Sequence, residues 1–306
     1  MWQGVGGIMQ TQKSAYLFTA LTVIFWGGAA SAFKLALTEL SPFSLLAYAT
    51  GLSFFFLLIL LAVQGRLKEL TMLSRKELVS SLALGLINPL LYYLVLFKAY
   101  ALLPGQIAMA LNYAWPLVLT LLSVPILGQK LQVYQLVAVA VSFFGAVLIA
   151  TKGQLTSFGE LNGLGLVLAL CSTVIWAVFW LVNARDRVDP VLKLLLSFFS
   201  ALCCVIVMAL WQGGVDVPNG KTLLPLIYVG LFEMGLTFVL WLSALQRAQS
   251  AASIGNLIYC TPFLSLVFLH FVVGEEIYAA TFLGLFLIVG SLLFQEVVRL
   301  RVKKLS

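Results

Sequence analysis

One acidic residue stands inside a long apolar stretch, where a charged group is costly. Glu233 is the only charged residue of the segment 222–246. A carboxyl at the centre of a membrane-spanning helix costs about 2.5 kcal/mol or more unless it faces protein or water. Two kinds of chemistry fit such a group: proton exchange coupled to a flux, or a counter-charge for an amino group on a bound solute. The alternative is a structural carboxyl bonded to Asn88 or to a neighbouring helix.

Tryptophans and tyrosines also occur in the interior of the apolar stretches. They are Trp26, Tyr92, Tyr93, Tyr113, Trp115, Trp176, Trp180, Trp241 and Tyr259. Trp176 and Trp180 share one helix face at i and i+4, as do Asn88 and Tyr92. Such rings favour flat or apolar solutes by stacking and bind an amino group by cation–π contact. Any single ring has the alternative of an interfacial belt.

These residues define a predicted solute-binding set. Its members combine the buried carboxyl with the amides, hydroxyls and rings of the central apolar stretches. The set is Trp26, Asn88, Tyr92, Asn112, Tyr113, Trp115, Trp176, Trp180, Glu233, Thr237 and Tyr259.

Two prolines interrupt apolar stretches at matching places. Pro116 and Pro262 each remove a helical hydrogen bond and are expected to kink their helices. Asn112 and Thr261 are placed to bond the freed carbonyls or a solute. We predict that the two prolines are the hinges of a gate. The alternative is a static kink that serves packing.

Other reactive residue types do not form sites. Lys34 is expected either to extend to the membrane surface or to reach Glu233 or a substrate carboxylate. His270 is the one histidine, and a single imidazole cannot build a metal site. The four cysteines fall in apolar stretches without metal-ligand spacing. Because neither a nucleophile with a base nor a phosphate-binding loop occurs, we expect no enzyme, no cofactor and no ATP.

The composition indicates that lipid is the solvent of most of the chain. Of 306 residues, 62% are hydrophobic and 9% charged, and the mean hydropathy is +1.08. Backbone polar groups in lipid must be satisfied within helices or a closed barrel, and continuous apolar stretches of about 20 residues indicate helices. The predicted class is an all-α polytopic membrane protein. Its ten predicted spans are 15–38, 42–63, 78–100, 104–127, 131–151, 162–184, 190–211, 222–246, 250–273 and 276–297.

The basic residues predict the orientation of these spans. One face holds Lys13, Arg66, Lys68, Arg75, Lys76, Lys130, Arg185, Arg187, Arg247, Arg299, Arg301, Lys303 and Lys304. The other face holds Lys152, Lys221 and at most Lys98. Since cytoplasmic loops carry the excess of lysine and arginine, both termini are expected in the cytoplasm of a plasma (inner) membrane. The net charge of +7 therefore indicates orientation and not a nucleic-acid partner.

The chain contains an internal repeat. Leu111–Leu131 aligns without a gap on Leu257–Ile277, 146 residues further on, and Gly85–Asn88 aligns on Gly230–Glu233. Five spans per half is an odd number, so the second half is inverted in the membrane. The predicted units are 1–153 and 154–306. Inverted repeats with interrupted helices are typical of secondary transporters, whose substrate site lies where the halves meet.

The run Asn112-Tyr113-Ala114-Trp115-Pro116, followed by Gly128-Gln129-Lys130, resembles the YddG-like aromatic amino-acid exporters. Over nearly its whole length the chain is similar to the ten-helix EamA-type proteins of the drug/metabolite transporter superfamily. This resemblance implies a basket of two inverted bundles. It also implies a cavity formed by the first, third, fourth, sixth, eighth and ninth spans.

The predicted function is secondary active transport of small organic metabolites such as amino acids, with aromatic ones favoured. Alternating access would proceed by rocking of one half against the other. We expect coupling to protons through Glu233 and a functional monomer; the outward direction is implied by the resemblance alone. The alternatives are an uncoupled facilitator or channel, which Glu233 disfavours, and a broad drug/metabolite efflux protein.

Overall fold

A computed structural model describes residues 3–127, 132–153, 161–183, 188–248, 254 and 257–305. The predicted turn Gly128-Gln129-Lys130 and the basic residues Arg185 and Arg187 lie outside these residues. The described helices are α1 (Gln3–Ala36), α2 (Pro42–Val63), η1 (Leu67–Met72), α3 (Arg75–Gly85), η2 (Leu86–Leu91), α4 (Tyr92–Leu102), α5 (Gly105–Asn112), α6 (Trp115–Leu127), α7 (Val133–Ala150), α8 (Gly163–Asn183), α9 (Pro190–Gln212), α10 (Gly220–Ile227), η3 (Tyr228–Leu236), α11 (Thr237–Arg247), α13 (Thr261–Phe268), η4 (Leu269–Val273) and α14 (Ala279–Leu305).

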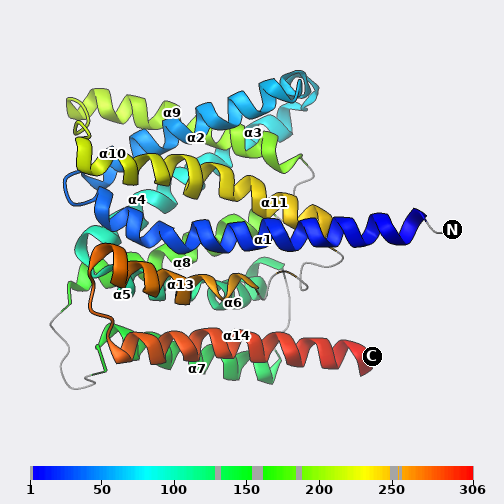
Figure 1. Ribbon diagram of the computed structural model, residues 1–306, viewed down its shortest axis with the longest axis vertical. Helices are drawn as coiled ribbons and strands as arrows, with labels where there is room; N and C mark the ends of the chain where they lie inside the picture. The colour runs from blue at the N-terminus through cyan, green and yellow to red at the C-terminus, as the bar shows by residue number, and fades with distance from the viewer. Residues whose placement is uncertain are drawn as a thin grey trace.

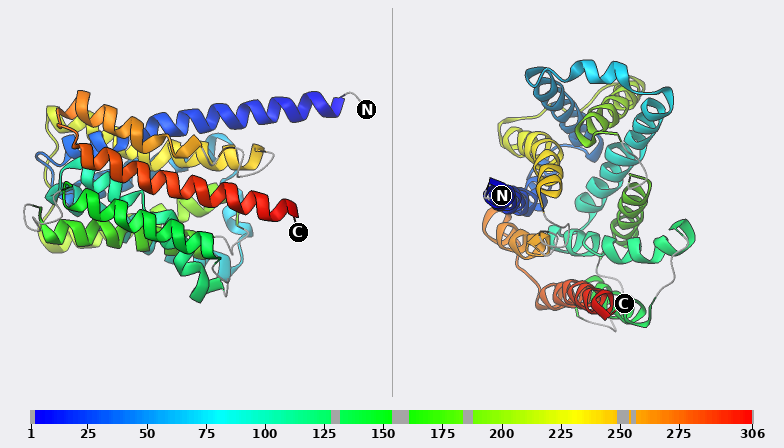
Figure 2. Two further views of the ribbon diagram at one scale, coloured as in Figure 1. Left: turned by 90° about the horizontal axis from the view of Figure 1, so that it is seen from below. Right: turned by 90° about the vertical axis from the view of Figure 1, so that its right-hand side faces the viewer.

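These helices supply ten spans in the predicted order. Eight are long and apolar enough to cross a membrane, and two shorter apolar helices supply the fifth and ninth. The third span is α3–η2–α4, the fourth α5–α6, the eighth α10–η3–α11 and the ninth α13–η4. The prediction of an all-helical ten-span protein is confirmed. Both chain ends lie at one end of the bundle, here called the terminal end, and the opposite end is the distal end (Figure 1, Figure 2).

The two halves pack on each other in a pattern that is unchanged when they are exchanged. The first span α1 packs against α11 and α13, and its counterpart α8 packs against α4 and α6. Likewise α2 packs on η3, while its counterpart α9 packs on α3. The pairs α2 with α9 and α7 with α14 lie on opposite edges of the molecule (Figure 1). With five spans per half, this pattern is that of inverted repeats; the division after residue 153 stays a prediction.

The starts of the second and seventh spans use the same helix signal. Ser41 accepts a hydrogen bond from the backbone of its own helix α2, and Pro42 occupies the first turn. Asp189 does the same for α9, followed by Pro190. A capping oxygen and a proline in the first turn satisfy or remove the N–H groups that a helix start leaves unpaired. The sequence therefore fixes where both of these spans begin.

Polar contacts tie these two spans together at both ends. At the terminal end, Arg66 Nη2 lies 3.1 Å from Asp189 Oδ2 and also pairs with Glu69. This group is the terminal clasp. At the distal end, Asp216 Oδ2 accepts hydrogen bonds from Ser41 N at 2.7 Å and from the hydroxyl of Ser44 at 2.8 Å. In this distal clasp, the bonds from Ser41 and Ser44 hold the pKa of Asp216 below its usual value.

Candidate functional site

A cavity of about 130 Å³ lies between the two halves. Its wall is built from the first, third, fourth, sixth, eighth and ninth spans, the six that the resemblance implies. Eight residues of the predicted set line it, namely Trp26, Tyr92, Asn112, Tyr113, Trp115, Trp176, Trp180 and Glu233. The wall also includes Tyr93 and Trp241, and two polar residues that sequence analysis missed, Tyr100 and Ser265. The structure therefore brings together residues that are up to 239 positions apart, from Trp26 to Ser265.

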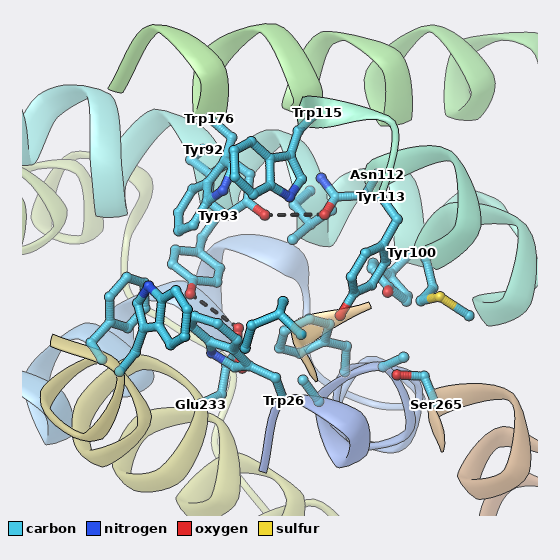
Figure 3. Close-up of a pocket in the computed structure, with 18 of the residues that line it drawn as sticks. Trp26, Tyr92, Tyr93, Tyr100, Asn112, Tyr113, Trp115, Trp176, Glu233 and Ser265 are labelled. Atoms are coloured by element: carbon cyan, nitrogen blue, oxygen red, sulfur yellow. Dashed lines mark hydrogen bonds between the residues drawn. The ribbon is translucent and has the colours of Figure 1, made fainter. Parts of the chain in front are cut away.

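Aromatic rings make up most of this wall. Trp115 and Trp180 are stacked with their centroids 6.5 Å apart, and the rings of Tyr92 and Trp176 lie 4.5 Å apart. Trp26 lies on the other side of the cavity, beside the acidic residue (Figure 3). Ring faces carry a negative quadrupole, so such a wall attracts flat solutes and cations.

Glu233 supplies a carboxyl to the cavity. It is 8% exposed and lies in η3, where the eighth span widens into a π-helix. The hydroxyl of Tyr93 donates a hydrogen bond to Oε1 at 3.1 Å, while Oε2 is buried without a partner among the described residues (Figure 3). The alternative bond to Asn88 is not formed, since Oε1 accepts from Tyr93 and Oε2 accepts from no described residue; the bond to a neighbouring helix is the one from Tyr93 of α4. Tyr93 is thus the anchor of the carboxyl, and one oxygen is left for a solute or proton.

The π-helix around Glu233 is supported from outside the cavity. Ser53 of α2 donates a hydrogen bond to the carbonyl of Gly230 at 2.7 Å. Thr237, which is fully buried, donates to the carbonyl of Phe232. These hydroxyls satisfy carbonyls at the irregular part of the helix, and short π segments occur frequently at functional sites. Thr237 does not line the cavity; its hydroxyl supports the backbone that carries the carboxyl.

Two more residues of the predicted set lie away from the cavity. Asn88 interrupts the third span with extended backbone angles, φ −143° and ψ 120°, in a segment that packs against α9. Tyr259 is half-buried near Glu296 and Arg299 of α14. The structure does not bring Asn88 or Tyr259 to the cavity wall, so contact of either with a solute stays a prediction.

The fourth and ninth spans break at equivalent places. Residues 113–114 separate α5 from α6, and residues 259–260 precede α13. Pro116 and Pro262 are each the second residue after the break, where the missing N–H costs little. Asn112, at the first break, donates to Ser172 Oγ at 2.8 Å and accepts from the hydroxyl of Tyr92 at 3.3 Å. The breaks are structural facts, whereas motion about them stays a prediction.

A polar layer covers the distal side of the cavity. The carboxylate of Glu275 accepts hydrogen bonds from the backbone N–H groups of Gly105, at 2.6 Å, and Gln106, at 3.1 Å. The amide of Gln106 in turn donates to the carbonyl of Glu276 and accepts from Tyr278 N. A negative group is favoured at the N-terminus of a helix such as α5. Glu275 therefore joins the start of the fourth span to the end of the ninth.

Lys34 belongs to this layer and not to the cavity. Its Nζ donates to the carbonyls of Tyr100, at 3.1 Å, and Leu103, at 3.0 Å. The expected reach to Glu233 is not formed. The rings of Phe33 and Tyr100, 5.1 Å apart, line the cavity next to the polar layer. The carbonyls of Tyr100 and Leu103 satisfy the ammonium where it stands, which is the physical reason that it does not enter the cavity.

One buried basic residue was overlooked in the sequence. Lys193 of α9 is 6% exposed and borders a small pocket of about 20 Å³ with Trp180 and Phe238. A lysine four positions into an apolar span was the signal available. Among the described residues, no group of three or more His, Cys, Asp or Glu side chains is placed to hold a metal ion. His270 instead lies with Nδ1 3.1 Å from the carbonyl of Glu275.

Several known proteins are similar to this chain in fold or in sequence. A crystal structure with 21% sequence identity covers 95% of this chain and 99% of its own, with a TM-score of 0.65, and supports the fold alone. An uncharacterized transporter of Archaeoglobus fulgidus is 26% identical over 271 residues, which are 86% of this chain and 91% of the relative. The uncharacterized transporter YvbV of Bacillus subtilis is 23% identical over 280 residues, 90% of this chain and 89% of the relative.

A third relative is a named exporter. The aromatic amino acid exporter YddG of Ancylobacter novellus is 25% identical over 185 residues, 58% of this chain and 62% of the relative. The EamA-like transporter family matches twice, over residues 13–151 and again over 163–295. These two matches together cover most of the ten-span chain. The protein therefore belongs to the EamA-like transporter family, within the drug/metabolite transporter superfamily, and is a multi-pass membrane transporter.

Proposed function

We propose that the protein is a secondary active transporter that exports small organic metabolites by alternating access. Its substrates are amino acids and related amphipathic metabolites, with aromatic ones favoured. The protein works as a monomer in the plasma membrane with both termini in the cytoplasm. The observation that carries this proposal is the cavity between the inverted halves, which combines a ring-lined wall with the buried carboxyl of Glu233.

The size of the cavity favours small solutes over bulky drugs. Drug-sized ligands occupy pockets of about 300–1,000 Å³, whereas this cavity measures about 130 Å³. An engineered apolar cavity of about 150 Å³ holds one benzene molecule. The space as it stands therefore suits a solute of about the size of one aromatic ring. The partial match to an aromatic amino acid exporter supports the same class.

Coupling to protons is assigned to Glu233. Its Oε2 has no partner among the described residues, so it is free to take a proton or to bind an ammonium group. A carboxyl that alternates between these two partners links solute movement to proton movement. An uncoupled facilitator would not require a titratable group at this depth.

The distal polar layer supports a conformation that is closed on the distal side. Glu275 and Lys34 hold the fourth, ninth, first and third spans together above the rings of Phe33 and Tyr100. Rocking of one half against the other would separate Glu275 from Gly105 and Gln106, because these contacts cross between the halves, and would open the cavity to the exterior. The layer is therefore proposed as the outer gate.

The test is transport into proteoliposomes with imposed pH gradients, across aromatic, aliphatic and basic amino acids. We expect gradient-driven accumulation of aromatic substrates, and its loss in Glu233→Gln. Glu276→Gln is the matched control, because the Glu276 side chain is exposed and only its carbonyl takes part in the outer gate. Unchanged accumulation in Glu233→Gln would show that the coupling assignment is wrong. Equilibration without accumulation by the unmodified protein would indicate a facilitator.

A further inference from the structure

We infer that the cavity prefers solutes with one ammonium group and no carboxylate, so that aromatic amines bind more tightly than amino acids with the same ring. This inference rests on the proposed function and specifies its substrate class. The charges of the cavity wall carry it. Among the described residues that line the cavity, Glu233 alone carries a charged side chain. The other polar groups of the wall are neutral hydroxyls, indoles and an amide.

An ammonium group finds a complete site in this cavity. Glu233 Oε2 is buried and unpartnered, so a bound ammonium would supply both the missing hydrogen bond and the missing counter-charge. The rings of Trp26 and Tyr93 lie beside the carboxyl in the close-up view and add cation–π attraction. The aromatic body of the solute would then lie toward the tryptophans on the other side of the cavity (Figure 3).

A carboxylate finds much less. The hydroxyl of Tyr93 already donates to Glu233, the hydroxyl of Tyr92 donates to Asn112, and the Asn112 amide donates to Ser172. Trp180 Nε1 and Ser265 Oγ are buried and unpartnered, but both are neutral donors. They suit a hydroxyl or a carbonyl on the solute. A buried carboxylate without a positive partner, in the same cavity as another carboxylate, is unfavourable.

The two basic side chains near the cavity do not face it. Lys34 is bonded to the carbonyls of Tyr100 and Leu103 in the polar layer on the distal side. Lys193 does not line the cavity and borders a separate small pocket with Trp180. Neither ammonium lines the cavity, so neither is placed to pair with the carboxylate of a zwitterion there.

The experiment compares four ligands that share one phenyl ring. Phenethylamine carries only the ammonium, phenylalanine methyl ester carries the ammonium and a masked carboxyl, phenylalanine carries both charges, and 3-phenylpropanoate carries only the carboxylate. Binding to the purified full chain is measured by tryptophan fluorescence, and exchange is measured in proteoliposomes with equal pH on both sides. We expect the amine and the ester to bind at least about tenfold more tightly than phenylalanine. The reason is that burying the carboxylate of phenylalanine without a positive partner costs this much or more.

Two variants assign the preference to its residues. Glu233→Gln keeps the shape of the side chain and removes its charge, so the ratio of amine affinity to amino-acid affinity should fall toward one. Lys193→Met should leave this ratio unchanged. A selective loss of phenylalanine binding in Lys193→Met would show that this lysine binds the carboxylate and would overturn the inference. The ligand series on the unmodified chain remains decisive if a variant does not fold.

The outcomes separate the inference from the proposed function. Phenylalanine bound as tightly as phenethylamine overturns the inference and leaves transport of aromatic metabolites intact. If none of the four ligands binds or exchanges, the proposed aromatic substrate class fails, and the inference fails with it. Tight binding of 3-phenylpropanoate would likewise contradict the charge argument.

Discussion

The segments Gly85–Asn88 and Gly230–Glu233 occupy equivalent places in the third and eighth spans, and they differ in what they present. Both interrupt the α-helix, the first with extended angles at Asn88 and the second with a π-helix. Both begin with a glycine pressed against a span of the other half. Only Glu233 lines the cavity and carries a charge. The irregular backbone therefore belongs to the shared fold, whereas the carboxyl belongs to one half.

The glycines test the shared part of this comparison and give the largest expected effect. A Cβ on Gly85 would lie 2.1 Å from the backbone oxygen of Ser197 and 2.2 Å from Ser200 Oγ. Because backbone cannot move aside, Gly85→Ala must separate α3 from α9. We expect a loss of about 3 kcal/mol or more, at or above the upper end of ordinary overpacking, or failure to fold. Thermal unfolding in detergent measures it.

Two further glycines calibrate that result. A Cβ on Gly230 would lie 2.6 Å from Leu52 Cβ, which is fixed to the backbone of α2 but is farther away than the 2.1 Å contact at Gly85. Gly230→Ala should therefore cost less, about 1–3 kcal/mol. Gly290 in α14 has no atom within 4 Å of its added Cβ, so Gly290→Ala should be neutral or stabilising by up to about 1 kcal/mol. Equal stability of the Gly85 and Gly290 variants would contradict the close packing of α3 on α9.

The next effect concerns the part that the halves do not share. Glu233→Gln should lower the rate of amine exchange at least about tenfold, because the charge that pairs with the bound ammonium is lost. Asn88→Ser should change substrate affinity less than about twofold, since Asn88 does not line the cavity and an extended residue accepts most side chains. Exchange assays at equal pH on both sides measure both. A large loss of substrate affinity in Asn88→Ser would show that Asn88 belongs to the binding site.

The sequence was sufficient to predict the spans and most of the cavity wall. Hydropathy identifies a span because a long apolar stretch is stable in lipid only when its backbone polar groups bond to each other within a helix. The buried position of Glu233 followed from the same argument. Rings such as Trp176 and Trp180 were placed on one face by helical spacing alone. These inferences need only local pattern, which a single sequence contains.

Partnerships between spans could not be predicted in this way. Tyr93, not Asn88, donates to Glu233, although Asn88 is the counterpart of Glu233 in the repeat. Thr237 was placed in the cavity on sequence grounds but supports Phe232 instead, since the irregular turn leaves a carbonyl to satisfy. Glu275 follows a turn glycine, and its partners at the start of α5, Gly105 and Gln106, are 170 and 169 residues away in sequence. Such contacts depend on tertiary packing, which local spacing does not contain.

The two ends of the pathway provide a second comparison and a smaller effect. At the distal end Glu275 binds the start of α5, whereas the sequence repeat aligns Glu275 with the uncharged Gln129, which is outside the described residues. Glu275→Gln keeps an acceptor but loses the charge that the helix N-terminus favours, worth about 0.3–1 kcal/mol. The closed distal side should therefore open roughly two- to fivefold more often.

Thiol labelling measures this opening. Ala30→Cys places a thiol in the cavity wall, in a background that lacks the four native cysteines. A membrane-impermeant reagent added on the distal side should label the Glu275→Gln variant faster than the parent. Glu276→Gln should label at the parent rate. Equal rates in all three proteins would show that the Glu275 contact does not close the pathway.

The smallest effect concerns the clasps that join α2 and α9. Asp216→Asn keeps an acceptor for Ser41 but loses the charge, and at an exposed site we expect a cost of at most about 1 kcal/mol. Because the folded pKa of Asp216 lies below the usual 3.8, its contribution is complete above that value and is lost as pH falls through the lower folded pKa. The difference in thermal stability between Asp216→Asn and the parent should therefore be constant near neutral pH and vanish in strong acid. A difference that grew with acidification would mean that the Asp216 carboxylate is not stabilised by Ser41 and Ser44, and the distal clasp would then not match the terminal one.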